Sequence, residues 1–96
     1  MFIHLGGDVI IRSKEIIAIL DRDVGDMSVI TKDYLKSEKE RKKCTVISQD
    51  FTKSIVITDD VVYLSPVSSL TLNKRAQAVS ELELQLSTEE DQVQKN

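Results

Sequence analysis

Few residues of this 96-residue chain could carry out covalent chemistry, and they do not form a catalytic set. His4 is the only histidine, and it lies in an apolar, strand-like run, where an imidazole more often packs or hydrogen-bonds than catalyses. A serine nucleophile of the G-x-S-x-G type has no counterpart in the sequence. Cys44 follows a basic run, a setting in which thiols can be reactive, but a small, partly buried strand residue is the simpler interpretation. We therefore expect no catalytic residue and no enzyme.

Sites for metals and phosphates are no better supported by the sequence. Gly6-Gly7-Asp8 lacks the third glycine and the G-K-[ST] ending of a phosphate-binding loop, so a turn is the better interpretation. Asp59-Asp60 lacks the loop length and ligand spacing of a calcium site, and a hairpin turn explains the pair. Zinc would need cysteine and histidine ligands that the chain does not offer. We expect no metal, no cofactor and no small-molecule substrate.

Charge is the remaining chemical feature, and it is unevenly distributed. The net charge is −3, but the segment from Glu81 to the end carries −4, so residues 1–80 are slightly basic. The window 32–43 alone carries +3. Basic side chains attract nucleic-acid phosphates, and each phosphate contact adds a salt-dependent increment to the affinity. A solvated helix with internal pairs such as Glu38–Lys42 explains the same run at least equally well.

The apolar pattern places these charges on a small α+β domain. Runs at 2–5 and 9–12 flank the Gly-Gly-Asp turn and predict a hairpin, and the β-branched run 16–20 predicts a buried strand. A polar turn follows at 21–26. Aromatic residues are scarce and tryptophan is absent, so Ile, Val and Leu must build the core.

The middle of the chain predicts a basic helix and then more strands. Residues 31–43 are rich in helix formers, with Thr31 as the expected N-cap and cations in the last turn. Runs at 45–48, 53–58 and 61–64, separated by short polar turns, predict an antiparallel meander. In total we expect an antiparallel sheet of about five short strands with a basic middle helix and a C-terminal helix.

The last helix is predicted to begin at Ser68 or Ser69. Its apolar stripe consists of Leu72, Ala76, Val79, Leu82 and Leu86. We expect part of this stripe to cover the sheet and part to meet another subunit. The segment 87–96 is polar and acidic and is predicted to be a disordered tail, which leaves residues 1–86 as a single domain.

Features that address proteins to other compartments are missing from the sequence. The start has no basic n-region and no long apolar stretch, so we expect no signal peptide. No apolar run reaches the length needed to cross a membrane. The single cysteine also suits a reducing compartment. We therefore expect a cytoplasmic protein without a membrane partner.

Three stretches carry a family resemblance: FIHLGGD at 2–8, IIAIL at 16–20 and KSIVITDDVVYLSPV at 53–67. They closely resemble the bacterial extracellular matrix regulatory proteins RemA and RemB, the RemB branch in particular. The resemblance covers residues 1–79 and rests on hydrophobic spacing and turn residues. It implies a regulator that activates biofilm-matrix genes, with a fold similar to LytTR DNA-binding domains and, in the RemA branch, a ring-shaped homo-oligomer that binds DNA directly.

The resemblance also implies where DNA contacts would lie. The RemA branch has arginines just before the Ile-Ile strand and in the turn before the Val-Val-Ile strand. Here those places hold Lys14 beside Glu15, and Lys53 after Asp50. Lysine keeps the charge but lacks the bidentate fork of arginine. The candidate DNA contacts are Arg12, Lys14, Lys53, Lys39, Arg41, Lys42 and Lys43.

Two functions are therefore open. The first is a homo-oligomeric, DNA-binding transcriptional regulator, motivated by the resemblance and by the basic body. The alternative is an oligomeric scaffold, or a partner of a paralogous DNA-binding regulator, without DNA contacts of its own. Glu15, Asp50 and the acidic tail motivate this alternative because they would oppose phosphate binding.

Overall fold

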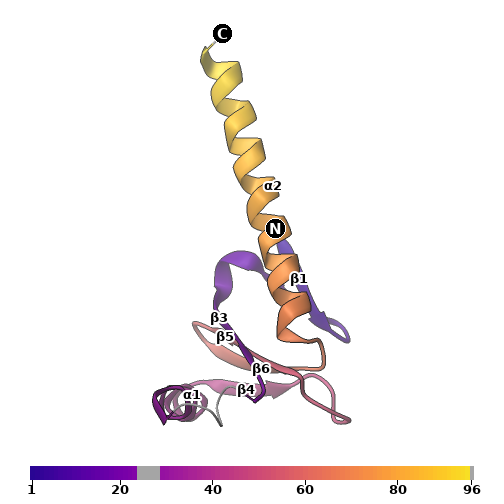
Figure 1. Cartoon of the computed structure of the whole chain (residues 1–96), viewed down its shortest axis with the longest axis vertical. Helices are drawn as coiled ribbons and strands as arrows, with labels where there is room; N and C mark the ends of the chain where they lie inside the picture. Colours follow the sequence, from indigo (N-terminus) through magenta and orange to yellow (C-terminus); the bar gives the residue numbers. More distant parts are fainter. Residues whose placement is uncertain (24–28, 96) are drawn as a thin grey trace.

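The computed structural model describes residues 1–23 and 29–95, and the side chains of these residues up to 86. These described residues form six strands, a short 3-10 turn and two helices, arranged around two sheets (Figure 1). In chain order they are β1 (Phe2–Gly6), β2 (Val9–Arg12), η1 (Ser13–Glu15), β3 (Ile16–Asp21), α1 (Val29–Arg41), β4 (Lys43–Val46), β5 (Ser54–Thr58), β6 (Val61–Ser65) and α2 (Ser69–Lys95). The α+β class predicted from the sequence is confirmed.

The predicted N-terminal hairpin is present as β1 and β2, which pair antiparallel in a two-stranded sheet. Its turn depends on Gly6 and Gly7, whose φ angles are 119° and 52°. Only glycine adopts the first of these without strain. A Cβ on Gly6 would also lie 2.9 Å from Cγ of Pro66, so the hairpin and the β6–α2 connection approach each other closely here.

The larger sheet has four strands in the order β3-β5-β6-β4. The pairs β3–β5 and β5–β6 are antiparallel as predicted, but β4 lies on the far edge and pairs parallel to β6. The meander interpretation was therefore wrong for β4, and the described residues contain six strands rather than about five. Because β3 and β4 run in the same direction on opposite edges, α1 is the crossover between them.

Each face of this sheet carries its own apolar cluster. On one face, Val56 of β5 packs with Leu72 of α2 and with Ile3, Leu5 and Ile11 of the hairpin. On the other face, the cluster consists of Ile55, Ile57 and Val62, with Leu35 of α1 packed against it. The alternation along β5 sends successive side chains to opposite faces, which is why all five of its residues are buried.

Two buried serines tie the connection after β6 to the rest of the fold. The Ser65 hydroxyl donates to the carbonyl of Leu5 at 2.6 Å and accepts from the amide of Val67 at 3.0 Å. The Ser54 hydroxyl donates to the carbonyl of Val67 at 2.7 Å. These bonds satisfy polar groups in a region that excludes water, as buried groups require.

The C-terminal helix begins as predicted. The Ser68 hydroxyl accepts from the amide of Thr71 at 3.2 Å, which is the geometry of an N-cap. The first part of the predicted stripe covers the sheet and hairpin through Leu72, Ala76 and Val79, whereas Leu82 and Leu86 are exposed. The helix then leaves the body and extends through Lys95, over most of the segment predicted as a disordered tail (Figure 1).

Two smaller expectations are corrected by the structure. Helix α1 begins at Val29, so Thr31 lies in its first turn rather than at its N-cap. Cys44 lies in edge strand β4 and is exposed, not partly buried. The predicted polar turn at 21–26 lies partly outside the described residues. Among the helices that are described, none has a stretch both long and apolar enough to span a membrane.

Candidate nucleic-acid interface

The last turn of α1 holds an ion-pair cluster that uses part of the basic run. The Lys42 Nζ lies 2.6 Å from a carboxylate oxygen of Glu38 and donates to the carbonyl of Thr58 at 2.7 Å. Only 6% of the Lys42 side chain is exposed. Arg41 approaches the same carboxylate at 3.4 Å from the solvent side. Lys42 is therefore unable to reach a phosphate, although the sequence made it a candidate contact.

The same cluster changes the acidity of Glu38. The hydrogen bond from Lys42 lowers the pKa of the Glu38 carboxyl from its ordinary value of 4.5, and the charges of Lys42 and Arg41 add to this effect. Partial desolvation opposes it. The internal pair Glu38–Lys42, which the sequence offered as an explanation of the basic run, is thus present. It accounts for only one lysine of that run.

Three other lysines of α1 line an open groove between the helix and the sheet. Lys32, Lys36 and Lys39 stand at i, i+4 and i+7, so they share one face of the helix. Arg22, at the end of β3, faces them across the groove, which has a volume of about 620 Å³. Among the described residues of its lining, Glu40 is the one carboxylate. We call this hollow the basic groove.

The floor and electrostatics of the basic groove differ from those of an ordinary solvated helix face. Leu35, Ile55 and Leu64 form an apolar floor. Among the described residues, no ion pair joins Lys32, Lys36 or Lys39 to a carboxylate, whereas Arg22 pairs with exposed Asp23 at 3.5 Å.

A second, smaller hollow of about 310 Å³ adjoins the basic groove and shares Arg22 and Thr52 with it. The Arg22 guanidinium donates to the carbonyl of Thr52 at 3.3 Å, which fixes the wall between the two hollows. The Lys53 ammonium lies 5.5 Å from the centre of the half-exposed Phe51 ring. An aromatic face beside two cations offers contacts to nucleobases and phosphates, but Asp21 and Asp23 line the same hollow and offset these charges.

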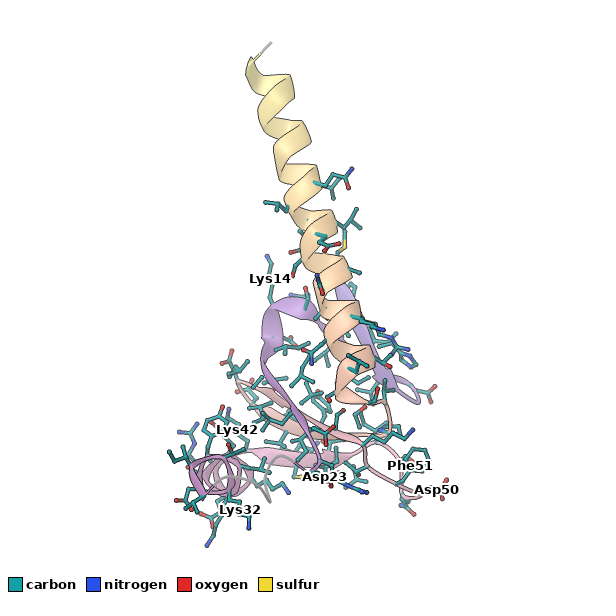
Figure 2. The ribbon with its side chains drawn as sticks, in the orientation of Figure 1. Lys14, Asp23, Lys32, Lys42, Asp50 and Phe51 are labelled. Carbon is teal, nitrogen blue, oxygen red and sulfur yellow. The ribbon has the colours of Figure 1, made fainter. Side chains whose placement is uncertain are left out.

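Lys14 lies at the opposite end of the sheet from Lys53. Strand β3 pairs antiparallel with β5, so that Ile16 is opposite Thr58 and Asp21 is opposite Ser54. At roughly 3.4 Å per residue, this separates the two lysines by about 17 Å or more along the strand. Figure 2 shows Lys14 near α2, well away from Lys32 and Phe51.

The surroundings of Lys14 are also acidic. Its neighbour Glu15 lines a hollow together with Asp59 and Asp60 from the β5–β6 turn. Arg12, in β2, pairs with exposed Phe2 across the hairpin. The two arginine-equivalent positions of the family resemblance therefore do not form one surface in this chain.

The remaining candidates from the sequence lie around the C-terminal end of α1. Lys39 lines the basic groove, whereas Arg41 contacts Glu38. Lys43 begins edge strand β4, and its amide donates to the carbonyl of Asp60 at 3.3 Å. Of the seven predicted contacts, Lys39 is thus the one in the basic groove, and Lys53 adjoins it.

Three cations of the basic groove were not among the DNA contacts predicted from the sequence. Lys32 and Lys36 carry a signal in the sequence, because their spacing with Lys39 places all three on one helix face. Arg22 carries none: it stands between two aspartates in what the sequence presents as a solvated turn. Only the antiparallel pairing of β3 with β5 brings it to the groove.

The fold and this surface define a small α+β domain with a basic groove along a crossover helix. A model of the RemA-like family, described as Extracellular matrix regulatory protein A-like, matches residues 2–76, and the chain belongs to this family. A particular relative is Extracellular matrix regulatory protein B of Bacillus subtilis (strain 168), which is 40% identical over 83 residues. The match covers 86% of this chain and 99% of that protein, so the RemB-like resemblance is confirmed.

Proposed function

We propose that this protein regulates extracellular-matrix genes as a cytoplasmic homo-oligomer that binds duplex DNA through phosphate contacts. The name of its Bacillus subtilis relative, Extracellular matrix regulatory protein B, supports the first part. The single observation that carries the second is the row of Lys32, Lys36 and Lys39 along the basic groove, with Arg22 opposite. No cofactor or catalytic step belongs to this proposal.

The geometry suits a backbone contact rather than the reading of base edges. The three lysines extend over about 10 Å of helix axis, at 1.5 Å per residue, which matches a few successive phosphates of one strand. Lysine acts on phosphate as a point charge and carries no base information by itself. Selection among DNA sequences would then come from the shape and deformability of the duplex.

Oligomerisation supports the proposal because one subunit offers few phosphate contacts. Phe2 is 65% exposed and Ile10 is 60% exposed on the outward side of the hairpin, which leaves apolar surface for a neighbouring copy. A closed ring with a LytTR-like subunit, as the family resemblance implies, would repeat the weak contact around a bent duplex. Such repetition raises the affinity without any new contact.

A second candidate function is an oligomeric scaffold, or a partner of a paralogous DNA-binding regulator. The observation that favours it is the acidic surrounding of Lys14, where Glu15, Asp59 and Asp60 share one hollow. A phosphate placed there would meet three carboxylates. In this alternative the basic groove binds an acidic protein surface.

The test is a titration of duplex DNA into the purified protein at 50 and 200 mM salt, with the mass in solution measured alongside. We expect a multimer whose affinity falls roughly 3-fold to 4-fold per phosphate contact over this range. The double variant Lys32→Glu, Lys36→Glu should lower the affinity by more than about tenfold at low salt. The matched control Lys14→Glu should change it little.

Two results would contradict the proposal. A multimer without affinity for DNA at either salt would favour the scaffold alternative. Strong loss of binding in Lys14→Glu with full binding in the Lys32, Lys36 double variant would move the interface to the opposite end of the sheet. Lys53→Glu separates the two ends further, because Lys53 adjoins the basic groove and lies far from Lys14.

A further inference from the structure

We infer that the basic groove of one copy receives the acidic leucine segment of α2 from a second copy. The acidic leucine segment is defined as residues 81–86, with the sequence ELELQL. This inference concerns contact between protein copies, and it does not depend on DNA binding.

The acidic leucine segment lies where α2 extends beyond the sheet; Glu83 pairs at 3.5 Å with the N-terminal ammonium of Met1, and Glu81 accepts from the Gln77 amide at 3.2 Å. The same stripe that packs Leu72, Ala76 and Val79 against the sheet and hairpin continues to Leu82 and Leu86, which are 44% and 45% exposed. These two leucines stand at i and i+4, so they share one helix face. The apolar stripe of an amphipathic helix presents an apolar surface to a partner where it extends beyond the sheet that it covers.

The charges beside these leucines have the sign opposite to that of the groove. Glu81 and Glu83 flank Leu82, and three further acids at 89–91 follow in the sequence. Among the described residues, the basic groove offers four cations and the one carboxylate of Glu40, and no ion pair joins three of these cations to a carboxylate. Complementary charges of this kind fix the partner and its orientation.

The apolar parts match as well. Leu35, Ile55 and Leu64 form the floor of the groove, and long lysine side chains border it. A helix that lays leucines on this floor would bring its flanking glutamates to the lysine ammonium groups. This is the helix-in-groove mode of recognition, with anchors at i and i+4. A phosphate backbone would use the rim of the groove but leave this floor uncovered.

The occupant must come from another copy because of the overall shape. The molecule measures 53 Å along its longest axis, and Figure 1 shows α1 and the C-terminal end of α2 at opposite ends of that axis. A chain therefore cannot place its own segment in its own groove. Each copy offers one groove and one segment, so the contact is head-to-tail and can propagate or close into a ring.

The consequence is competition at one surface. A groove that holds the acidic leucine segment has its lysines neutralised, so duplex DNA and a second copy exclude each other there. The assembly built by this contact is therefore distinct from the DNA-binding oligomer of the proposed function, in which the exposed hairpin face of Phe2 and Ile10 is available for a neighbouring copy. Raising the salt weakens the charged part of the docking and leaves the apolar part. Docking of the segment would thus suppress weak, non-specific binding to DNA.

The test measures mass in solution across a concentration series, without DNA, by sedimentation of the full chain. The groove variant Lys36→Glu, Lys39→Glu and the segment variant Glu81→Lys, Glu83→Lys should each weaken self-association by more than about tenfold. Lys74→Glu on α2 and Leu70→Glu before the segment are matched controls, and both should associate like the unchanged chain. Circular dichroism of every variant reports whether the fold is retained.

The decisive sample is an equimolar mixture of the two double variants. One partner keeps its groove and the other keeps its segment, so the mixture regains the native contact. The reversed groove and the reversed segment also carry opposite charges, so the mixture should associate more strongly than either double variant alone. Failure of the folded mixture to associate would overturn the inference, as would self-association that ignores both double variants. A multimer that ignores them but still binds DNA would leave the proposed function intact, since its interface would then lie elsewhere.

Discussion

The Lys42 ammonium lies 2.6 Å from a Glu38 carboxylate oxygen, at the junction of α1 with the sheet. The same ammonium also donates to the carbonyl of Thr58, at the end of β5. Helix α1 has few apolar side chains, and its Leu35 packs against the cluster of Ile55, Ile57 and Val62. This ion pair is therefore a main tether of the crossover helix that positions the basic groove.

Replacement of Lys42 by methionine should destabilise the protein. Methionine keeps most of the volume but leaves Glu38 without its nearest cation and Thr58 without a donor, and the loss of one partner from a buried pair is costly. We expect the midpoint of thermal unfolding to fall by roughly 5 °C or more. Lys36→Met is the matched control in the groove, and an equal fall in both variants would contradict a special role for Lys42.

The lowered pKa of Glu38 predicts a specific dependence of stability on pH. A carboxyl whose pKa is lower in the folded than in the unfolded state stabilises the fold above its ordinary pKa, here 4.5. This contribution should decline as the pH falls from 4.5 towards the lowered value. Chemical unfolding of the unchanged chain and of Glu38→Gln between pH 7 and pH 3 measures it. A constant difference between the two curves over this range would contradict the pairing.

The position of β4 shows which part of the fold local sequence patterns do not encode. The runs that became β4, β5 and β6 follow one another with short polar breaks, which is the pattern of a meander. Segment 47–53 instead carries the chain past β6 to the centre of the sheet, and β4 takes the edge. The length of a polar connection limits how far the chain can travel but does not determine which strand it meets.

Only the part of the candidate site that lies on a single helix could be predicted from the sequence. The spacing of Lys32, Lys36 and Lys39 determines a common face before any tertiary contact is known. The difference between Lys42 and these lysines was not predictable, because it depends on the carbonyl of Thr58 from a distant strand. Arg22 likewise joins the groove through strand pairing alone.

Ser65→Ala should destabilise the link between the hairpin and the sheet. The substitution removes a donor to the carbonyl of Leu5 and an acceptor for the amide of Val67, in a position that water does not reach. The cost of leaving such groups unpaired is about 1–3 kcal/mol. Denaturant unfolding measures this change, with exposed Ser80→Ala as the control. A loss no larger than that of the control would mean that other groups satisfy Leu5 and Val67.

The two turn glycines should respond differently to substitution. Gly6→Ala combines a φ of 119° with a Cβ only 2.9 Å from Pro66, so we expect a loss of about 1–3 kcal/mol. Gly7 has a φ of 52°, in the region that asparagine tolerates, and its nearest Cβ contact is 3.5 Å away at Ile47. Gly7→Asn should therefore cost little. Equal losses in denaturant unfolding would contradict this assignment of the turn.

The salt dependence of DNA binding counts the lysines of the basic groove that reach phosphates. Each lost phosphate contact should reduce the slope of log affinity against log salt by about 0.9. Lys36→Gln removes one groove cation, and Lys74→Gln removes another exposed cation from α2, outside the groove. Both substitutions change the net charge by the same amount, so a long-range effect of charge would alter both slopes alike. A lower slope in Lys36→Gln alone would place a phosphate at the groove, whereas unchanged slopes in both variants would exclude Lys36 as a contact.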